Sequence, residues 1–174
     1  MLTLSLLRHA KSSWSDPRLK DFERPLNDRG DSAAPRMGAL MARRGIRPDL
    51  ILCSTAVRAR QTLNLVLPHL KGAPELIYED SLYLASSATM LKRLHRVGTE
   101  VSHAMIVGHD PGMHTMAVEL AGSGSPGDLG RLAEKFPTAG LAVIVFDVDA
   151  WRAVQWGSGR LKLFTAPKRL QVAA

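Results

Sequence analysis

The sequence has little of what a cross-linked or membrane-embedded protein requires. Cys53 is the only cysteine in the 174 residues, so the chain cannot form an internal disulfide, and we expect no structural zinc site. No apolar run approaches the roughly 18 residues of a membrane-spanning helix. The first residues have neither a basic region nor an apolar stretch long enough for a secretory signal. We therefore expect a cytoplasmic protein.

Other absences narrow the organisation and the chemistry. There is no internal repeat, low-complexity tract or linker, so we expect one domain over residues 1–174, with a frayed tail after about residue 167. The sequence lacks the G-x-x-x-x-G-K-[ST] loop of ATP-binding proteins and the H-E-x-x-H spacing of zinc enzymes. We expect structural or surface roles for four histidines: His69, His95, His103 and His114. The sequence predicts no cofactor and no metal.

The charge balance favours anionic partners. The net charge is +7, and residues 1–60 contain twelve basic and six acidic side chains, so this third carries most of the excess. A basic surface attracts phosphorylated molecules, nucleic acid or anionic lipid, although it can also serve solubility alone. We expect two clusters to be solvated helix faces or ends: Lys92, Arg93 and Arg96, and Arg43, Arg44 and Arg47. Charge does not decide between these partners.

The pattern of apolar residues predicts an α/β protein. Short aliphatic runs alternate with amphipathic stretches, which is typical of helices packed on a parallel sheet. We expect a three-layer α/β/α sandwich with a mostly parallel central sheet. The expected buried strands are 2–7, 50–53, 75–78, 104–107, 141–147 and 161–164. The expected helices lie near 33–41, 59–70, 88–94 and 111–121, the third behind Ser86 or Ser87 as its cap and the fourth capped by Asp110, with Pro111 in its first turn.

One segment is expected to be irregular. Residues 122–140 contain five of the 14 glycines, which predicts a long surface connection around a short helical turn at 129–135. Such a connection is a candidate lid.

Three expected strands end in residues suited to phosphate chemistry. Arg8 and His9 follow the first strand, Arg58 falls in the first helical turn after the second, and His109 follows the fourth. Ligand sites gather at the carboxyl ends of parallel strands, so these side chains are expected to converge. A neutral imidazole is a nucleophile, and a guanidinium binds two phosphoryl oxygens at once.

The sequence resembles a known family, the histidine phosphatase (phosphoglycerate mutase-like, RHG) superfamily, and within it the SixA-like phosphohistidine phosphatases. The matching stretches are Leu6 to Ala10, Arg24 to Gly30, Ser54 to Thr62, Val107 to Pro111 and Phe136 to Gly140. The resemblance implies that His9 is transiently phosphorylated, that Arg8 and Arg58 hold the phosphoryl oxygens, and that His109 completes the pocket. It also suggests Ser15 as a substrate contact. Ala10 departs from the family pattern, where a glycine is usual.

The general acid of mutase-like relatives has no clear counterpart here. Glu79 and Asp80 lie in the expected region, and a solvated loop is an equally good interpretation of them. An alkoxide leaving group benefits from an acid by about 10²–10⁴-fold, whereas protonated phosphohistidine releases neutral imidazole readily. The weakly defined acid therefore favours phosphohistidine as substrate.

The sequence thus predicts a metal-independent phosphatase with Arg8, His9, Arg58 and His109 as its catalytic set and a phosphorylated protein as its substrate. One alternative is an enzyme of the same fold that hydrolyses small phosphate esters. Another is a noncatalytic module that binds a phosphoprotein or nucleic acid, which the positioned nucleophile disfavours. We expect no membrane partner, and the sequence does not predict the oligomeric state.

Overall fold

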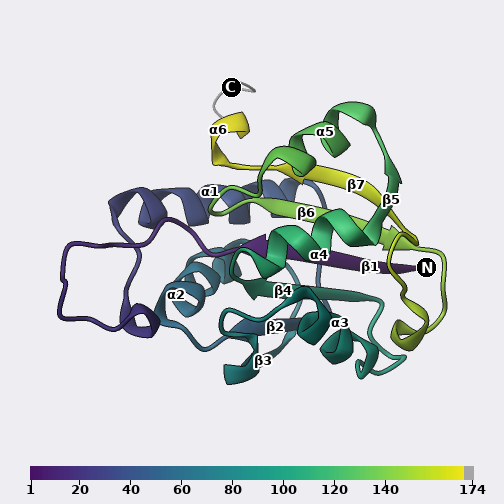
Figure 1. The fold of residues 1–174 in the computed structure, drawn as a ribbon, viewed down its shortest axis with the longest axis horizontal. Coiled ribbons are helices and arrows are strands. Elements are labelled where there is room, and N and C mark those ends of the chain that lie inside the picture. Colours follow the sequence, from purple (N-terminus) through teal and green to yellow (C-terminus); the bar gives the residue numbers. More distant parts are fainter. Residues whose placement is uncertain (171–174) are drawn as a thin grey trace.

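A seven-stranded sheet with helices on both faces forms the protein, as a computed structural model of residues 1–170 shows (Figure 1). The strands are β1 (Leu2–Arg8), β2 (Leu50–Ser54), β3 (Glu75–Glu79), β4 (His103–Gly108), β5 (Ala121–Gly124), β6 (Leu141–Phe146) and β7 (Gly159–Thr165). The α-helices are α1 (Asp28–Arg43), α2 (Val57–Val66), α3 (Ser87–His95), α4 (Gly112–Leu120), α5 (Pro126–Glu134) and α6 (Pro167–Leu170). Four short 3-10 turns, η1 to η4, are Asp21–Glu23, Leu67–His69, Asp80–Leu82 and Trp151–Ala153.

The sheet is mixed, with a parallel half that contains the expected site. The strand order is β3-β2-β4-β1-β6-β7-β5, and the first four strands are parallel to one another. β6 runs antiparallel to both β1 and β7. The expectation of a mostly parallel sheet in an α/β fold is therefore confirmed. Because β2, β4 and β1 are adjacent and parallel, their carboxyl ends lie side by side at one end of the strands.

Alternating side chains of the central strands supply two separate cores. Leu4 and Leu6 of β1 are fully buried on the side covered by α3, α4 and α5, whereas Leu7 packs on the side covered by α1 and α2. Successive strand side chains point to opposite faces, so one strand can serve both layers. The chain thus forms the three layers that its apolar pattern predicts. No helix within residues 1–170 combines the length and apolar character needed to cross a bilayer.

The prediction for residues 122–140 is wrong in its main point. This segment contains β5 at the sheet edge and α5, which begins at Pro126, so it is not an irregular connection. Ser125 caps α5, because its hydroxyl accepts a hydrogen bond from the amide of Asp128. Leu132 and Phe136 are almost fully buried in the core. These contacts tie the segment to the sheet.

Several smaller expectations also need correction. β3 is an edge strand whose side chains are mostly half-buried or exposed, because only β2 pairs with it. Arg93 is not a solvated face residue, since its side chain is 14% exposed and pairs with Glu79. Ala88 is exposed, and Met90 is the third buried residue of α3 beside Leu91 and Leu94.

Two helix boundaries differ from the prediction. Pro111 is the N-cap of α4 rather than a first-turn residue, and Asp110 accepts a hydrogen bond from the amide of His114. The expectation of a frayed tail after about residue 167 is wrong for residues 167–170, which form α6. The remainder of that tail, residues 171–174, lies outside the described residues.

Candidate active site

The carboxyl ends of three adjacent strands bring the predicted catalytic residues together. His9 follows β1, Arg58 lies in the first turn of α2 after β2, and His109 follows β4. The rings of His9 and His109 lie 5.2 Å apart, and the guanidinium Nε of Arg58 is 3.3 Å from His9 Nε2. The structure therefore places these side chains in one pocket, although they are up to 100 residues apart in sequence.

His9 is held as a neutral imidazole with a defined tautomer. Its Nδ1–H donates to the carbonyl oxygen of Ala10 at 2.7 Å, so Nε2 carries the lone pair. Burial is the main factor that lowers the pKa of His9 to about 3. The hydrogen bond to the Ala10 carbonyl opposes this shift, whereas His109 and the charges of Arg58 and Arg8 add to it. The Arg58 Nε–H points at the same Nε2 atom. His9 thus has the protonation state of a nucleophile.

Arg58 is a buried cation fixed from three directions. Besides its contact with His9, its two terminal nitrogens donate to Asp21, one to the backbone oxygen at 2.7 Å and one to Oδ2 at 3.0 Å. The side chain is 3% exposed, so its fork cannot sample other orientations freely. Thr62, one turn later in α2, bonds the Arg58 carbonyl and accepts from the amide of Ala10. This threonine joins the helix that carries Arg58 to the loop that carries His9.

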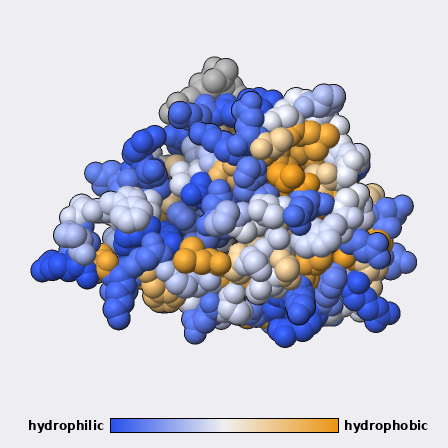
Figure 2. Space-filling view, in the orientation of Figure 1, coloured by the Kyte–Doolittle hydropathy of each residue, from blue (hydrophilic) through white to orange (hydrophobic). Residues whose placement is uncertain are grey.

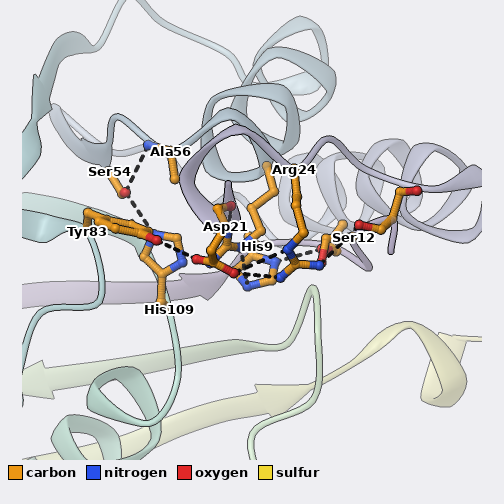
Figure 3. A network of polar contacts seen from close by, with 11 residues as sticks. His9, Ser12, Asp21, Arg24, Ser54, Ala56, Tyr83 and His109 are labelled. Atoms are coloured by element: carbon orange, nitrogen blue, oxygen red, sulfur yellow. Dashed lines mark hydrogen bonds and ion pairs between the residues drawn. The ribbon is translucent and has the colours of Figure 1, made fainter. Parts of the chain in front are cut away.

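Asp21 is the centre of a polar network that the sequence did not reveal (Figure 3). Its carboxylate accepts hydrogen bonds from Arg58, Arg24 and the phenol of Tyr83. Partial burial alone would raise the pKa of Asp21, but the hydrogen bonds from these donors hold it well below its usual range. Asp21 is therefore an anion that orients two guanidinium groups.

The segment from Arg24 to Gly30 has a clear physical role. The Arg24 guanidinium also donates to the Ser12 hydroxyl at 3.0 Å, which links this segment to the loop after His9. Asn27 caps α1 by accepting from the amide of Gly30. A Cβ at Gly30 would lie 2.2 Å from the Lys11 carbonyl oxygen, so only glycine permits this close approach.

His109 is positioned by Ser54, the last residue of β2. The Ser54 hydroxyl lies 2.7 Å from His109 Nε2 and accepts from the amide of Ala56 at 3.2 Å. Within residues 1–170 the buried Ser54 hydroxyl has no acceptor other than His109 Nε2, so we assign its proton to that contact and the proton of the neutral ring to Nδ1. Within residues 1–170, Nδ1 is buried and has no protein partner, and Figure 3 shows it on the side of the ring nearer His9. Burial lowers the pKa of His109 to about 4, and Arg58 reinforces this shift.

Arg8, the last residue of β1, also lines the site. It donates to the carbonyl of Phe136 at 2.8 Å and lies 3.5 Å from the carboxylate of Asp110. Burial is the main factor that lowers its pKa, and Arg58 adds to this effect. Its Nε is buried and has no partner within the described chain. Arg8 thus keeps donor capacity for an anion.

These side chains line a cavity of about 220 Å³ with an exposed rim. Its lining consists of Arg8, His9, Lys11, Ser12, Trp14, Arg24, Arg58, Leu84, His109, Asp110 and Thr138. Trp14 and Leu84 are 75% and 51% exposed, so both present apolar surface at the rim of the cavity. The Arg24 guanidinium stacks 3.5 Å from the centre of the Trp14 ring, which fixes the indole at the rim.

Three residues singled out in the sequence lie outside this lining. Ser15 is exposed and its hydroxyl bonds that of Ser13, so its contact with substrate stays a prediction. Glu79 pairs with Arg93 at 2.7 Å, and Asp80 accepts from Thr55. The structure therefore does not bring either carboxyl to the pocket as a general acid.

A carboxyl that the sequence suggested only as a helix cap does line the pocket. Burial raises the pKa of Asp110, although Arg8 and the amide of His114 oppose this shift. Its position directly after His109 was a signal that strand-end reasoning could have used. Within the described residues, no group of three or more His, Cys, Asp or Glu side chains is arranged to hold a metal ion.

Comparison with known proteins identifies the family. Residues 4–83 match the histidine phosphatase superfamily, branch 1. The chain is 37% identical over 164 residues to an uncharacterized protein of Mycobacterium tuberculosis. The aligned region covers 93% of this chain and all of that protein. The protein belongs to the histidine phosphatase superfamily.

Solved structures agree with this assignment. SixA from Agrobacterium tumefaciens, which is assigned as a phosphohistidine phosphatase, is 38% identical, with a TM-score of 0.78 over 95% of this chain and 98% of that chain. At 14% identity, a mycobacterial glucosyl-3-phosphoglycerate phosphatase has the same fold, with a TM-score of 0.67 over 95% of this chain and all of that chain. The fold alone therefore does not identify the substrate.

Proposed function

We propose that the protein is a metal-independent phosphatase that forms a phosphohistidine at His9. The observation that carries this proposal is the His9 imidazole, whose unprotonated Nε2 lies 3.3 Å from the Arg58 guanidinium. In the first step, the Nε2 lone pair attacks phosphorus and the bond between phosphorus and the leaving group breaks. Arg8, Arg58 and the Nδ1–H of His109 stabilise charge on the phosphoryl oxygens.

The Ala10 carbonyl prepares the second step. When Nε2 bonds to phosphorus, the proton stays on Nδ1, which continues to donate its hydrogen bond to the Ala10 carbonyl. The phosphorylated ring is then cationic, so it can depart as neutral imidazole when water attacks phosphorus. The products are inorganic phosphate and His9 in its original tautomer. A noncatalytic binding module would not require this lone pair.

A phosphohistidine on a protein is the substrate that the site favours. Glu79 and Asp80 lie outside the pocket, so a leaving group that needs little help from an acid fits best. The exposed Trp14 and Leu84 at the rim offer apolar contact area to a large partner, and tryptophan is enriched at the energetic centres of protein interfaces. The similarity to SixA supports the same choice.

One observation favours hydrolysis of small phosphate esters as a second candidate. Asp110 lines the pocket and has a raised pKa, as an acid that protonates an alkoxide requires. If Asp110 acts in this way, Asp110→Asn will impair the turnover of esters far more than that of phosphohistidine.

The deciding experiment compares these substrates on one enzyme. Release of phosphate is measured from a phosphohistidine protein, from phosphohistidine peptides and from a panel of alkyl phosphate esters, with wild type and Asp110→Asn. The proposal predicts a higher kcat/KM for phosphohistidine and little effect of Asp110→Asn on it. Faster turnover of an ester by wild type, lost in Asp110→Asn, would instead establish the second candidate.

A further inference from the structure

A larger basic cavity adjoins the catalytic pocket. Its volume is about 750 Å³, and it shares Arg8, Lys11, Asp110 and Thr138 with the catalytic cavity. An occupant of this space would therefore be contiguous with a phosphoryl group at His9. A volume of this size accommodates several side chains and far exceeds the need of a single phosphate.

Separate parts of the fold supply positive charge to this cavity. The basic side chains outside the catalytic set are Lys11, Arg29, Arg36, Lys135 and Lys168. None of these five forms an ion pair within residues 1–170. Asp28 is the one acidic lining residue besides Asp110, which is already paired with Arg8. The lining therefore concentrates a large share of the chain's excess charge next to the site.

The first two turns of α1 form one wall of the cavity, and α6 lies beside this helix (Figure 1). Arg29 and Arg36 are on the same face of α1, and Arg36 donates to the carbonyl of Pro167 at 2.9 Å, which ties α1 to α6. The amino-terminal end of a helix adds a partial positive charge to that of the side chains. Lys135, in the segment after α5, also lines the cavity. The backbone of three separate segments therefore frames the cavity, and the Arg36 hydrogen bond joins two of them.

We propose that this basic cavity binds an acidic segment of the protein that carries the phosphohistidine. This inference rests on the proposed function, which supplies the phosphohistidine protein as substrate. It adds that the basic cavity selects this protein through acidic residues near the phosphohistidine. Arg29, Lys135 and Lys168 are exposed, which suits the charged rim of a protein interface. Arg58, by contrast, is buried in the catalytic pocket, where a guanidinium fork suits a single phosphoryl group. Figure 2 shows that hydrophilic side chains cover most of the face seen in Figure 1, with apolar areas between them. In the cavity itself, five basic side chains without an ion pair within residues 1–170 lie near the single free carboxylate of Asp28, so charge complementarity is the dominant means of recognition there.

The test uses two labelled peptides with one central histidine that differ only at three flanking positions, glutamate in one and glutamine in the other. Both are prepared unphosphorylated and after chemical phosphorylation with phosphoramidate. The cavity variant is Arg29→Glu/Lys135→Glu, two exposed residues outside the catalytic pocket. The matched control is Arg43→Glu/Arg44→Glu, which makes the same charge change at the other end of α1. Thermal unfolding checks each variant, and Arg29→Ala/Lys135→Ala is the milder replacement.

The wild type is expected to bind and turn over the glutamate peptide better than the glutamine peptide, with a difference that shrinks as salt is added. The cavity variant should lose on the order of tenfold in kcat/KM for the glutamate peptide, mostly through KM, because rim charges each contribute modestly. Its turnover of phosphorylated N-acetylhistidine, which does not reach the cavity, should change less than about twofold. The control variant should behave as wild type.

Equal binding of the two peptides by wild type, or an unchanged KM for the glutamate peptide in the cavity variant, would overturn the inference. So would selective loss of inorganic tripolyphosphate binding in the variant without loss of peptide binding, since the cavity would then take a small polyanion. The binding of the unphosphorylated peptides, followed by fluorescence anisotropy, does not depend on turnover. If no phosphohistidine is hydrolysed, the proposed function fails, and this binding still tests the cavity separately.

Discussion

Ser54→Ala tests whether a buried hydroxyl sets the proton position on His109. Ser54 is fully buried, and its hydroxyl serves both His109 Nε2 at 2.7 Å and the amide of Ala56 at 3.2 Å. Alanine leaves both groups without this partner. A buried donor without an acceptor costs about 1–3 kcal/mol of stability, which lowers the Tm by roughly 2–12 °C for a chain of this size.

The effect on catalysis is separable from that on stability. Without the serine proton, the neutral His109 ring can place its own proton on Nε2, away from the phosphoryl group. Loss of one hydrogen bond worth about 1.4 kcal/mol in the transition state lowers kcat about tenfold. Cys53→Ala is the matched control, because Cys53 is an equally buried neighbour whose side chain packs on the opposite face of β2.

Stopped-flow phosphate release and thermal unfolding measure the two effects. The reasoning predicts a lower Tm in both variants but a lower kcat in Ser54→Ala alone. An unchanged kcat in folded Ser54→Ala would show that the hydroxyl has only a structural role, and an equal kcat loss in Cys53→Ala would show that the loss comes from packing.

Three further predictions concern Arg58, metal ions and acid. Arg58→Lys keeps the charge but cannot contact His9, the Asp21 backbone oxygen and Asp21 Oδ2 at once, so we expect a roughly 10- to 100-fold loss of kcat/KM in a folded protein; full activity would show that charge alone suffices. Activity should survive exhaustive treatment with EDTA, and loss that a divalent ion restores would contradict the metal-free scheme. His9 and His109 are neutral when folded, with pKa values lowered by burial to about 3 and about 4, whereas unfolded histidine titrates near 6.5. The unfolded state therefore binds more protons below pH 6.5, so stability is complete above that pH and falls below it, by about 2 kcal/mol per histidine at pH 5. Denaturant unfolding from pH 7 to 5 measures this loss, and a His9→Ala/His109→Ala variant with the same pH dependence would contradict its assignment to these residues.

Local patterns in the sequence predicted the parts of the site that depend on strand ends. Arg8, His9 and His109 each follow an apolar run directly, and adjacent parallel strands bring such positions together. Asp21, Tyr83 and Ser54 were not predicted, because their roles arise only when distant segments pack. Nothing near Asp21 in the sequence indicates that it will meet Arg58, 37 positions later.

The parts of the fold that the sequence did not predict also depend on contacts between distant segments. β5 has the sequence Ala-Gly-Ser-Gly, which has no strand pattern, and it is extended only because β7 offers an unpaired edge. The glycines there suggested a loop, yet Gly122 lies so close to the carbonyl of Gly157 that a side chain would not fit. Arg93 was predicted to be solvated because its partner Glu79 comes from a different element. The apolar periodicity of a sequence describes one helix or strand at a time, so it does not predict contacts between different elements.

The central claim is that His9 becomes phosphorylated, and trapping this intermediate tests it most directly. Wild-type enzyme is mixed with a ³²P-labelled phosphohistidine peptide, quenched within milliseconds in alkali, which preserves phosphorus–nitrogen bonds, and mapped by mass spectrometry. The account predicts a label on His9 that forms and decays at rates compatible with kcat, and no label in folded His9→Ala. Turnover by wild type with no labelled histidine, or full activity of His9→Ala, would contradict it.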